Sequence, residues 1–419
     1  MRSPEAPAPQ EAGASVSVLV LLVGAMWSIH AVSQFLRNSI GVIAPDLARD
    51  LGLGAAGIGL LSSAFFLGFA GAQVPLGVAI DRWGPRLAIS VSMGITVISV
   101  VLFAVAPTAE LLMLSRVLMG IGCASFLVGP LTIYSRWFRP ERFSTLVGIQ
   151  LGVSGLGVIG ATAPLAYAAG AVGWRTSFLA VAAFAAVVGL FVFAVARDNP
   201  PGRERPKSGE SLRQSFAGLA EVVRVPSFLP VFAMQFAGYS TFVTVFGLWA
   251  GPYLAHVYGY DLGQRGNVLF VLAVTNLIAS ASWGPTDRLF RSYKKPVLIG
   301  AGISAASLAW LAVVGKPSET MLLLWFVVFG TFASWTAVIT AHGRSLFPAA
   351  FVGRGLTLMN LGTMGGVFVL QAVTGAVVGL FDAPDGTYPL AAYRAAFGLL
   401  AAVLSICALI YMASREPAR

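Results

Sequence analysis

A stripe of polar residues runs along the first long apolar segment of the sequence. His30, Gln34, Arg37, Asn38 and Gly41 follow one another at spacings of 4, 3, 1 and 3 residues. At about 100° per residue they fall within an arc of roughly 100° on one helix face. A guanidinium beside an imidazole and two amides suits a small anion, which Arg37 would attract and the other side chains would orient. The alternative is a stripe satisfied by buried contacts with other helices.

The elements that position this stripe must be membrane-spanning helices. The chain has 419 residues, of which 57% are hydrophobic and 11% charged, and its mean hydropathy is +0.82. Soluble globular proteins are about 45–50% apolar and about 25% charged. The composition therefore excludes a soluble enzyme, a disordered chain and a nucleic-acid-binding protein, and makes the lipid bilayer the expected partner. Two cysteines exclude a disulfide framework.

Hydropathy predicts an all-α membrane protein with twelve spans in two groups of six. A span needs about 20 apolar residues. The expected spans are 16–44, 55–80, 87–106, 109–134, 143–170 and 174–196, followed by 227–256, 265–286, 296–315, 320–343, 354–381 and 391–413. The expected organisation is a tail (1–15), an N-terminal half (16–196), a linker (197–225), a C-terminal half (226–413) and a short tail (414–419).

The basic residues predict the orientation of the chain. With a cytoplasmic N-terminus, twenty Lys/Arg fall in cytoplasmic segments and five fall outside. Cytoplasmic loops carry an excess of Lys and Arg, so both termini and the linker are expected in the cytoplasm. The net charge of +10 has the same origin. We expect a multi-pass protein of the bacterial plasma (inner) membrane.

An internal repeat relates the two halves. Pro45 and Gly52 recur as Pro252 and Gly259 at an offset of 207, and further matches follow in the same order at offsets of 206 to 212. One of these further matches pairs Asp81-Arg82 with Asp287-Arg288. Parallel six-span repeats are the architecture of major-facilitator transporters, whose substrate sites lie near the midplane between the halves.

One loop resembles a signature of that superfamily. The segment between the second and third spans carries Gly77, Asp81, Arg82, Gly84 and Arg86, similar to G-x-x-x-D-R-x-G-[RK]-[RK], although Pro85 replaces the first basic residue. The resemblance implies that Asp81 accepts hydrogen bonds at a neighbouring helix N-terminus and latches the cytoplasmic side shut. The other interpretation is a solvated loop carboxylate. We assign Asp287 and Arg288 the corresponding gating role in the second half.

A narrower resemblance concerns Arg37. In the organophosphate and sugar-phosphate permease branch, an arginine in helix 1 lies eight residues before a proline, as Arg37 lies before Pro45. That branch has a second arginine at the symmetric place in helix 7, where this chain has Thr244. The missing arginine favours a monoanion, such as a carboxylate, over a dianionic phosphate ester.

A second basic residue lies inside a predicted span. Arg116, followed by Gly120, resembles a second superfamily motif in helix 4, and Asp46 is expected at a similar depth, where it could pair with Arg116. A charge inside a span is costly and therefore a functional candidate. We list both residues for gating or coupling, with a structural ion pair as the alternative.

Further polar residues could line the same cavity. They are Gln150, Tyr239, Thr244 and Asn360, each of which could instead form a hydrogen bond between helices. No acidic residue lies mid-span, so a carboxylate proton relay is not indicated, and His30 is the mid-span group that titrates near neutrality.

The sequence is thus interpreted as a secondary active or facilitative transporter that moves a small organic anion by alternating access, with or without a coupling ion. We expect a functional monomer. No enzymatic activity is expected, because no pairing of a nucleophile with a base is visible, and no cofactor is expected, because neither a P-loop nor a metal motif occurs. Two alternatives remain: an efflux pump for amphiphilic drugs or metabolites, and a sensor on the same fold that binds its substrate without transporting it.

Overall fold

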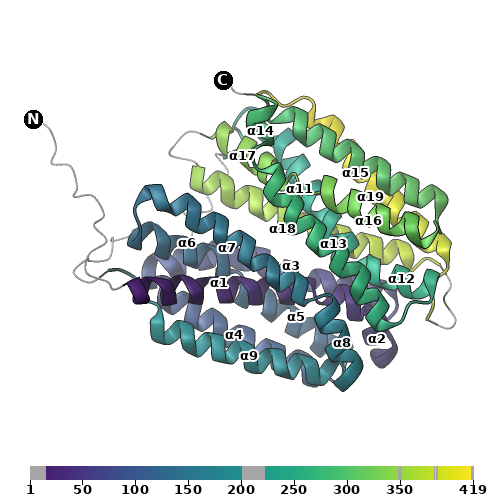
Figure 1. The fold of residues 1–419 in the computed structure, drawn as a ribbon, viewed down its shortest axis with the longest axis horizontal. Coiled ribbons are helices and arrows are strands. Elements are labelled where there is room, and N and C mark those ends of the chain that lie inside the picture. Colours follow the sequence, from purple (N-terminus) through teal and green to yellow (C-terminus); the bar gives the residue numbers. More distant parts are fainter. Residues whose placement is uncertain (1–15, 201–221, 348–351, 382, 384–385, 417–419) are drawn as a thin grey trace, which may run out of the picture.

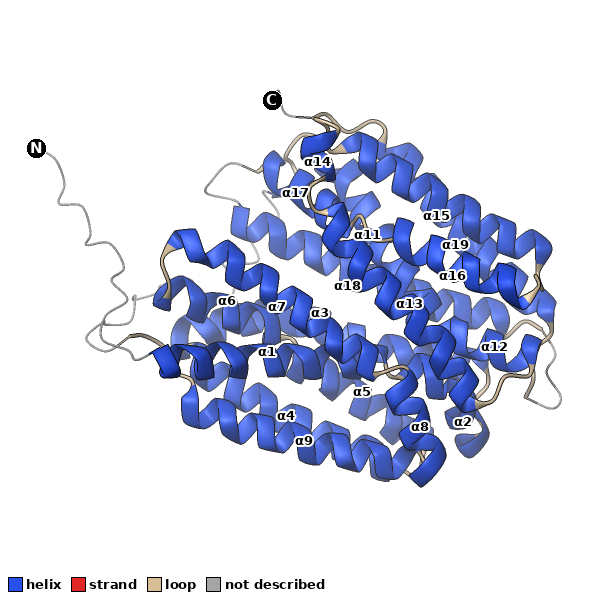
Figure 2. Ribbon diagram, viewed as in Figure 1, coloured by secondary structure: helices blue, strands red, loops and turns tan. Residues whose placement is uncertain are grey.

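The computed structural model is helical throughout the part of the chain that it describes, namely residues 16–200, 222–347, 352–381, 383 and 386–416 (Figure 2). Within these residues there is no strand, and twelve helical segments are long and apolar enough to cross a membrane. The predicted fold class is confirmed. Residues 1–15 and 201–221, which hold the predicted tail and most of the linker, lie outside the described residues, and the domain boundaries stay a prediction.

The helices form two groups that follow the order of the chain (Figure 1). The N-terminal half contains α1 (Val16–Asn38), α2 (Ile40–Leu51), α3 (Ala55–Trp83), α4 (Pro85–Val105), α5 (Ala109–Cys123), α6 (Ser125–Trp137), α7 (Pro140–Gly160), α8 (Ala163–Val172) and α9 (Trp174–Val195). The C-terminal half contains α11 (Phe228–Thr244), a π-helical turn η1 (Val245–Trp249), α12 (Ala250–Tyr258), α13 (Leu262–Trp283), α14 (Thr286–Leu289), α15 (Lys294–Val314), α16 (Glu319–Phe332), α17 (Thr336–Leu346), α18 (Val352–Val378) and α19 (Leu390–Tyr411).

The first and seventh spans are irregular at equivalent positions of the repeat. Ser39 separates α1 from α2, and the offset of 207 takes Ser39 to Phe246, inside the π-helical turn η1. The repeat also appears at the ends of these spans, where Gly52 and Gly259 both adopt positive φ angles, of 63° and 71°. Only glycine adopts this left-handed backbone at low cost. Broken helices expose backbone groups, which transporters use to line their sites.

Glycines bring the two halves together at one end of the bundle. We call this the far end, where α2 and α12 finish, and the opposite end, where α1 begins and α19 finishes, the terminal end. An added Cβ at Gly59 of α3 would lie 2.8 Å from the Cα of Gly375 in α18. An added Cβ at Gly266, the repeat equivalent of Gly59, would lie 3.0 Å from the Cα of Ala163 in α8. Both are backbone contacts that any side chain would separate.

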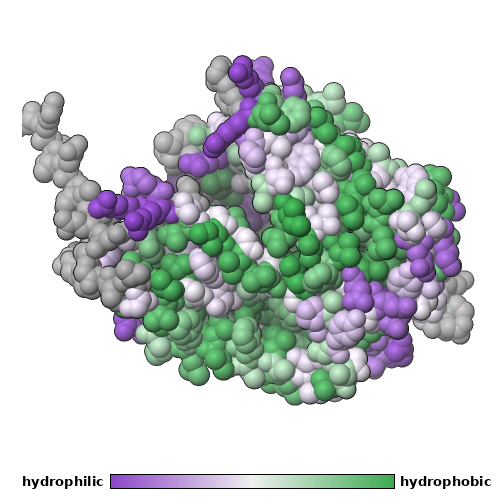
Figure 3. Space-filling model, in the orientation of Figure 1, coloured by the Kyte–Doolittle hydropathy of each residue, from purple (hydrophilic) through white to green (hydrophobic). Residues whose placement is uncertain are grey.

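The halves diverge toward the terminal end. Figure 1 shows α6 and α7 apart from α17 and α18, whereas α2, α8 and α12 gather at the far end. In Figure 3 the surface is hollowed between the halves on the terminal side. Apolar side chains cover most of the remaining visible surface, as expected where lipid surrounds the protein.

Candidate functional site

Arg37 lies deep inside the bundle, two residues before the break in the first span. Its side chain is 8% exposed, and Nη1 donates a hydrogen bond to the hydroxyl of Tyr239 in α11, at 3.2 Å. The guanidinium also stacks against two rings of α3, 4.8 Å from the centroid of Phe69 and 6.0 Å from that of Phe65. Arg37 therefore joins the first and seventh spans, and so the two halves.

The charge of Arg37 is not neutralised by the described part of the protein. No ion pair links Arg37 to an acidic side chain there, and Nε has no hydrogen-bond partner among the described residues. Its partners, a phenol and two aromatic faces, are neutral. A buried charge without a counter-ion is costly, so the site is suited to an anion that enters from outside.

The rest of the polar stripe is only partly hydrogen-bonded. Asn38 Nδ2 donates to the carbonyl of Gln34 at 2.8 Å. Within the described residues, Nδ1 of the buried His30 and Oε1 of Gln34 have no partner. The stripe thus keeps buried polar atoms without a partner among the described residues, and its role as an anion site stays a prediction.

The C-terminal half brings two of the predicted residues close to the break. Tyr239 contacts Arg37 directly, and Thr244, which is fully buried, immediately precedes η1. Thr244 Oγ1 has no partner among the described residues. Asn38 faces the same turn, because an added Cβ at Gly247 would lie 3.7 Å from Asn38 Oδ1.

Gln150 and Asn360 lie elsewhere. Gln150 on α7 is fully buried, and neither atom of its amide is paired with a described residue. Asn360 on α18 is half-buried, and no hydrogen bond joins it to Arg37 or Tyr239. Both stay candidates for the cavity wall, without a contact that places them in the site.

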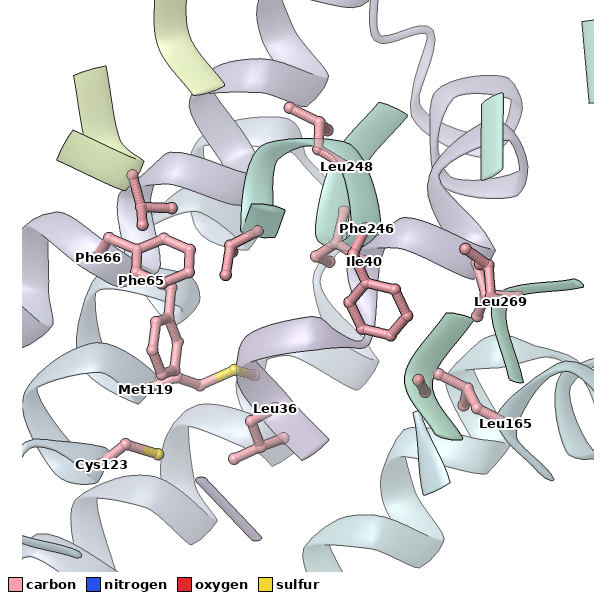
Figure 4. Close-up of a cluster of buried hydrophobic side chains, with 14 of the residues drawn as sticks. Leu36, Ile40, Phe65, Phe66, Met119, Cys123, Leu165, Phe246, Leu248 and Leu269 are labelled. Atoms are coloured by element: carbon pink, nitrogen blue, oxygen red, sulfur yellow. The ribbon is translucent and has the colours of Figure 1, made fainter. Parts of the chain in front are cut away.

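Arg116 does not pair with Asp46, so that expectation is wrong. Arg116 is fully buried, its Nη1 donates to the carbonyl of Leu36 at 2.7 Å, and its guanidinium lies 4.9 Å from the ring centroid of Phe65. The Oγ of Ser39, the residue at the break, also donates to this carbonyl, at 3.1 Å. Figure 4 shows Leu36, Phe65 and Met119 in one cluster of buried side chains, to which α1, α3 and α5 contribute.

Asp46 instead forms an ion pair across the two halves. Its carboxylate lies 3.1 Å from Nη2 of Arg265 at the start of α13 and 3.7 Å from Nη1 of the neighbouring Arg49. Asp46 lies ten residues beyond Leu36, about 15 Å along a helix, which places it at the far end and away from Arg116. Arg265 is 4% exposed and is not among the site residues predicted from the sequence. The sequence signal that could have placed Arg265 in the first turn of a helix is its position four residues after Asp261, the N-cap of α13.

Two further hydrogen bonds close the far end. The amide of Ala55 donates to the hydroxyl of Tyr388 at 2.7 Å, and the hydroxyl of Tyr167 lies 3.1 Å from Nδ2 of Asn267. Each bond joins the N-terminal half to the C-terminal half. These contacts lie beside the glycines that hold the two backbones together.

The predicted signature loop connects α3 to α4 at the terminal end. Asp81 and Arg82 are exposed on the last turn of α3, and Gly84 has a φ angle of 90°. The amide of Arg86 donates to Asp198 Oδ1 at 2.7 Å, and an added Cβ at Gly84 would overlap this carboxylate.

Three further predicted residues belong to the loop motif and its repeat, namely Gly77, Asp287 and Arg288. Gly77 has no atom within 4 Å of an added Cβ, so close packing does not require a glycine there. Asp287 and Arg288 lie on the short helix α14.

The described residues contain no group of His, Cys, Asp and Glu side chains that could hold a metal ion.

Comparisons with known proteins agree with this architecture. A family model described as Major Facilitator Superfamily matches residues 26–288. The chain is similar to a probable nitrate/nitrite transporter, NarK2, of Mycobacterium tuberculosis (27% identity, covering 94% of this chain and 96% of the relative). It is also similar to a hexuronate transporter of Bacillus subtilis (24% identity, covering 88% and 90%).

Solved structures show the same fold. A bacterial homologue of the human lysosomal transporter Spinster, in an inward-facing conformation, aligns with a TM-score of 0.78 at 18% identity and covers 97% of this chain and all of that one. Because the family model covers more than half of the sequence, this chain belongs to the major facilitator superfamily of membrane transporters.

Proposed function

We propose that this protein moves a small organic anion across the membrane by alternating access, with Arg37 as the residue that binds the anion. The observation that carries the proposal is the buried guanidinium of Arg37, which bridges the halves through Tyr239 and has no acidic partner in the described chain. An entering carboxylate can occupy the free side of the guanidinium and form charge-assisted hydrogen bonds.

The proposal specifies a monoanion. Arg116 is fully enclosed and donates to the Leu36 carbonyl, so it supports the break in the first span and leaves Arg37 as the available cation. Thr244 has a hydroxyl at the position where the sugar-phosphate permease branch has its second arginine. The names of the two relatives, for nitrate/nitrite and for hexuronate, agree with an anionic substrate.

Alternating access is supported by the contrast between the two ends. The ion pair of Asp46 with Arg265 and the Gly59–Gly375 contact close the far end, whereas the halves diverge at the terminal end. With the terminal end in the cytoplasm, as the distribution of basic residues predicts, the structure corresponds to a state open to the cytoplasm. The site then lies between the closed far end and the open side.

A thermal-shift comparison tests the proposal. Glucuronate and glucose differ by one carboxylate, so stabilisation of the purified protein by the first and not the second isolates the charge. A ligand at 100 times its Kd stabilises the fold by about 2.7 kcal/mol. Tartrate and nitrate extend the series to a dianion and an inorganic monoanion. Stabilisation by neutral or cationic amphiphiles alone would overturn the proposal in favour of efflux.

A further inference from the structure

A charged pocket opens at the terminal end, outside the site between the halves. It has a volume of about 380 Å³ and lies where α3, α4 and α9 meet. Its polar lining consists of Arg82, Arg86, Ser90, Arg197 and Asp198. Among the described residues, three guanidinium groups thus share one small pocket with a single carboxylate.

The single carboxylate is already engaged. Asp198 Oδ1 accepts the backbone amide of Arg86 at 2.7 Å, at the N-terminus of α4. Arg86 Nη2 donates to the carbonyl of Phe193 at 3.0 Å, and Arg86 Nε has no partner among the described residues. Counted over the part of the chain that the structure describes, the pocket therefore keeps an excess of positive charge and an unused buried donor.

An apolar groove continues from this pocket. The groove has a volume of about 650 Å³, shares Arg82, Trp83 and Leu87 with the pocket, and extends along α3 and α4 past Ala79 and Val91. Trp83, Leu87 and Val91 are 57%, 51% and 55% exposed. Apolar side chains this exposed on a membrane span face lipid.

We propose that this pocket and groove form a binding site for an anionic phospholipid, whose phosphate lies among Arg82, Arg86 and Arg197 while an acyl chain occupies the groove. The excess positive charge matches the phosphate, and the apolar groove beside it matches a hydrocarbon chain. A soluble phosphate would use the pocket but not the groove. Basic pockets between spans on the cytoplasmic side recognise lipid head groups in this way. The assignment of this site to the cytoplasmic leaflet rests on the topology in the proposed function. The position of the pocket and groove in the fold does not.

Lipid retention measured by native mass spectrometry tests the proposal. The full chain is incubated with dioleoylphosphatidylglycerol or with dioleoylphosphatidylcholine, which has the same chains and no net charge. We expect the wild type to retain the phosphatidylglycerol preferentially. Arg82→Gln and Arg197→Gln should each weaken this retention about fivefold, the equivalent of one basic residue at a membrane surface.

The matched control is Arg288→Gln, which removes the repeat equivalent of Arg82 in the other half. Retention should be unchanged in this variant, and an equal loss would overturn the proposal in favour of non-specific charge. Ala79→Phe fills the groove without altering a charge and should also weaken retention. If Ala79→Phe has no effect, or if glycerol 3-phosphate competes as strongly as the lipid, the occupant is a soluble phosphate and the lipid assignment is wrong.

Discussion

The guanidinium of Arg37 and the hydroxyl of Tyr239 lie 3.2 Å apart, the first on α1 and the second on α11. These helices belong to different halves of the molecule. The cation of the proposed site is therefore held by one half and oriented by the other. In the proposed mechanism, a ligand bound to Arg37 would contact both of these helices, whose relative movement would open and close the site, and binding would thereby be coupled to conformation.

The ion pair between Asp46 and Arg265 should hold the far end closed. Asp46→Asn leaves the buried guanidinium of Arg265 without its carboxylate, which costs about 3–5 kcal/mol when a buried pair is broken. We expect a lower Tm and greater labelling of a cysteine placed at the far end. The double variant Asp46→Asn/Arg265→Gln should recover part of the stability, because no charge is left unpaired.

Asp50→Asn is the matched control for this pair. Asp50 accepts the indole of Trp174 at 2.6 Å within the N-terminal half, so its loss should not change labelling at the far end. Equal labelling of the Asp46 and Asp50 variants would show that the Asp46–Arg265 pair does not control closure.

Close packing of Gly59 on Gly375 should be essential for closure of the far end. Leucine at position 59 would force α3 and α18 apart, at a cost of about 1–3 kcal/mol for overpacking. Gly71 lies on the same helix with no atom within 4 Å of an added Cβ, so Gly71→Leu is the control. We expect uptake into proteoliposomes to be lost in Gly59→Leu and kept in Gly71→Leu. Normal uptake in both variants would contradict the role of Gly59.

The sequence predicts the spans and the repeat well because both depend on local patterns. Hydropathy gives the twelve helices, and the offset of 207 relates Gly52 to Gly259, whose backbones are both left-handed. The break at Ser39 is a different case, since Pro45 signals an irregular first span but not the position of the interruption. Asp46 lies beside Arg265 rather than Arg116, because Arg116 contacts the first span ten residues earlier, at Leu36. Which side chains from distant segments pair with each other depends on how whole helices pack. Such pairs have no fixed residue spacing that could be recognised in the sequence.

Asp81 should act on the terminal gate rather than on the binding site. It lies on the last exposed turn of α3, at the opposite end of that helix from Gly59. In the predicted latch, the carboxylate of Asp81 lies at the N-terminus of a neighbouring helix, where a carboxylate contributes about 1 kcal/mol. Asp81→Asn should therefore slow exchange several-fold while affinity stays near normal. Exchange rates in proteoliposomes and calorimetric titration separate the two effects. A collapse of affinity with unchanged exchange would place Asp81 in the site instead.

The C-terminal segment should detach as the pH falls. The Glu416 carboxylate accepts hydrogen bonds from Ser292 Oγ at 2.9 Å, from the amide of Lys294 at 2.8 Å and from the amide of Tyr293. Partial burial raises the pKa of Glu416, but the hydrogen bonds from Lys294, Ser292 and Tyr293 outweigh it and lower the pKa below its ordinary value.

A lowered pKa in the folded state means that this carboxylate stabilises the protein above the ordinary pKa of a glutamate, about 4.3, and loses the effect as the pH falls further. Wild-type protein should therefore have a higher Tm than Glu416→Gln at pH 7, and the difference should shrink below about pH 4.3. A difference in Tm that does not change with pH would show that Glu416 acts without its charge.

The binding site itself is tested by removing the guanidinium of Arg37. Arg37→Lys keeps the charge but loses the planar pair of donors, so it should recover little affinity. Arg175 is a suitable control, because it donates to the carbonyls of Ala104 and Ala106 in the N-terminal half and has no place in the proposed site. Arg175→Ala should bind normally.

Calorimetric titration of Arg37→Ala with the anion that stabilises the wild type is the most direct measurement. Hydrogen bonds to charged groups contribute about 1.5–3 kcal/mol each, so the loss of two should weaken binding by at least a hundredfold. We predict that Arg37→Ala inserts and folds but shows no measurable binding. Wild-type affinity in Arg37→Ala would contradict the proposal, make Arg37 a structural charge between the two halves, and favour efflux of amphiphilic compounds.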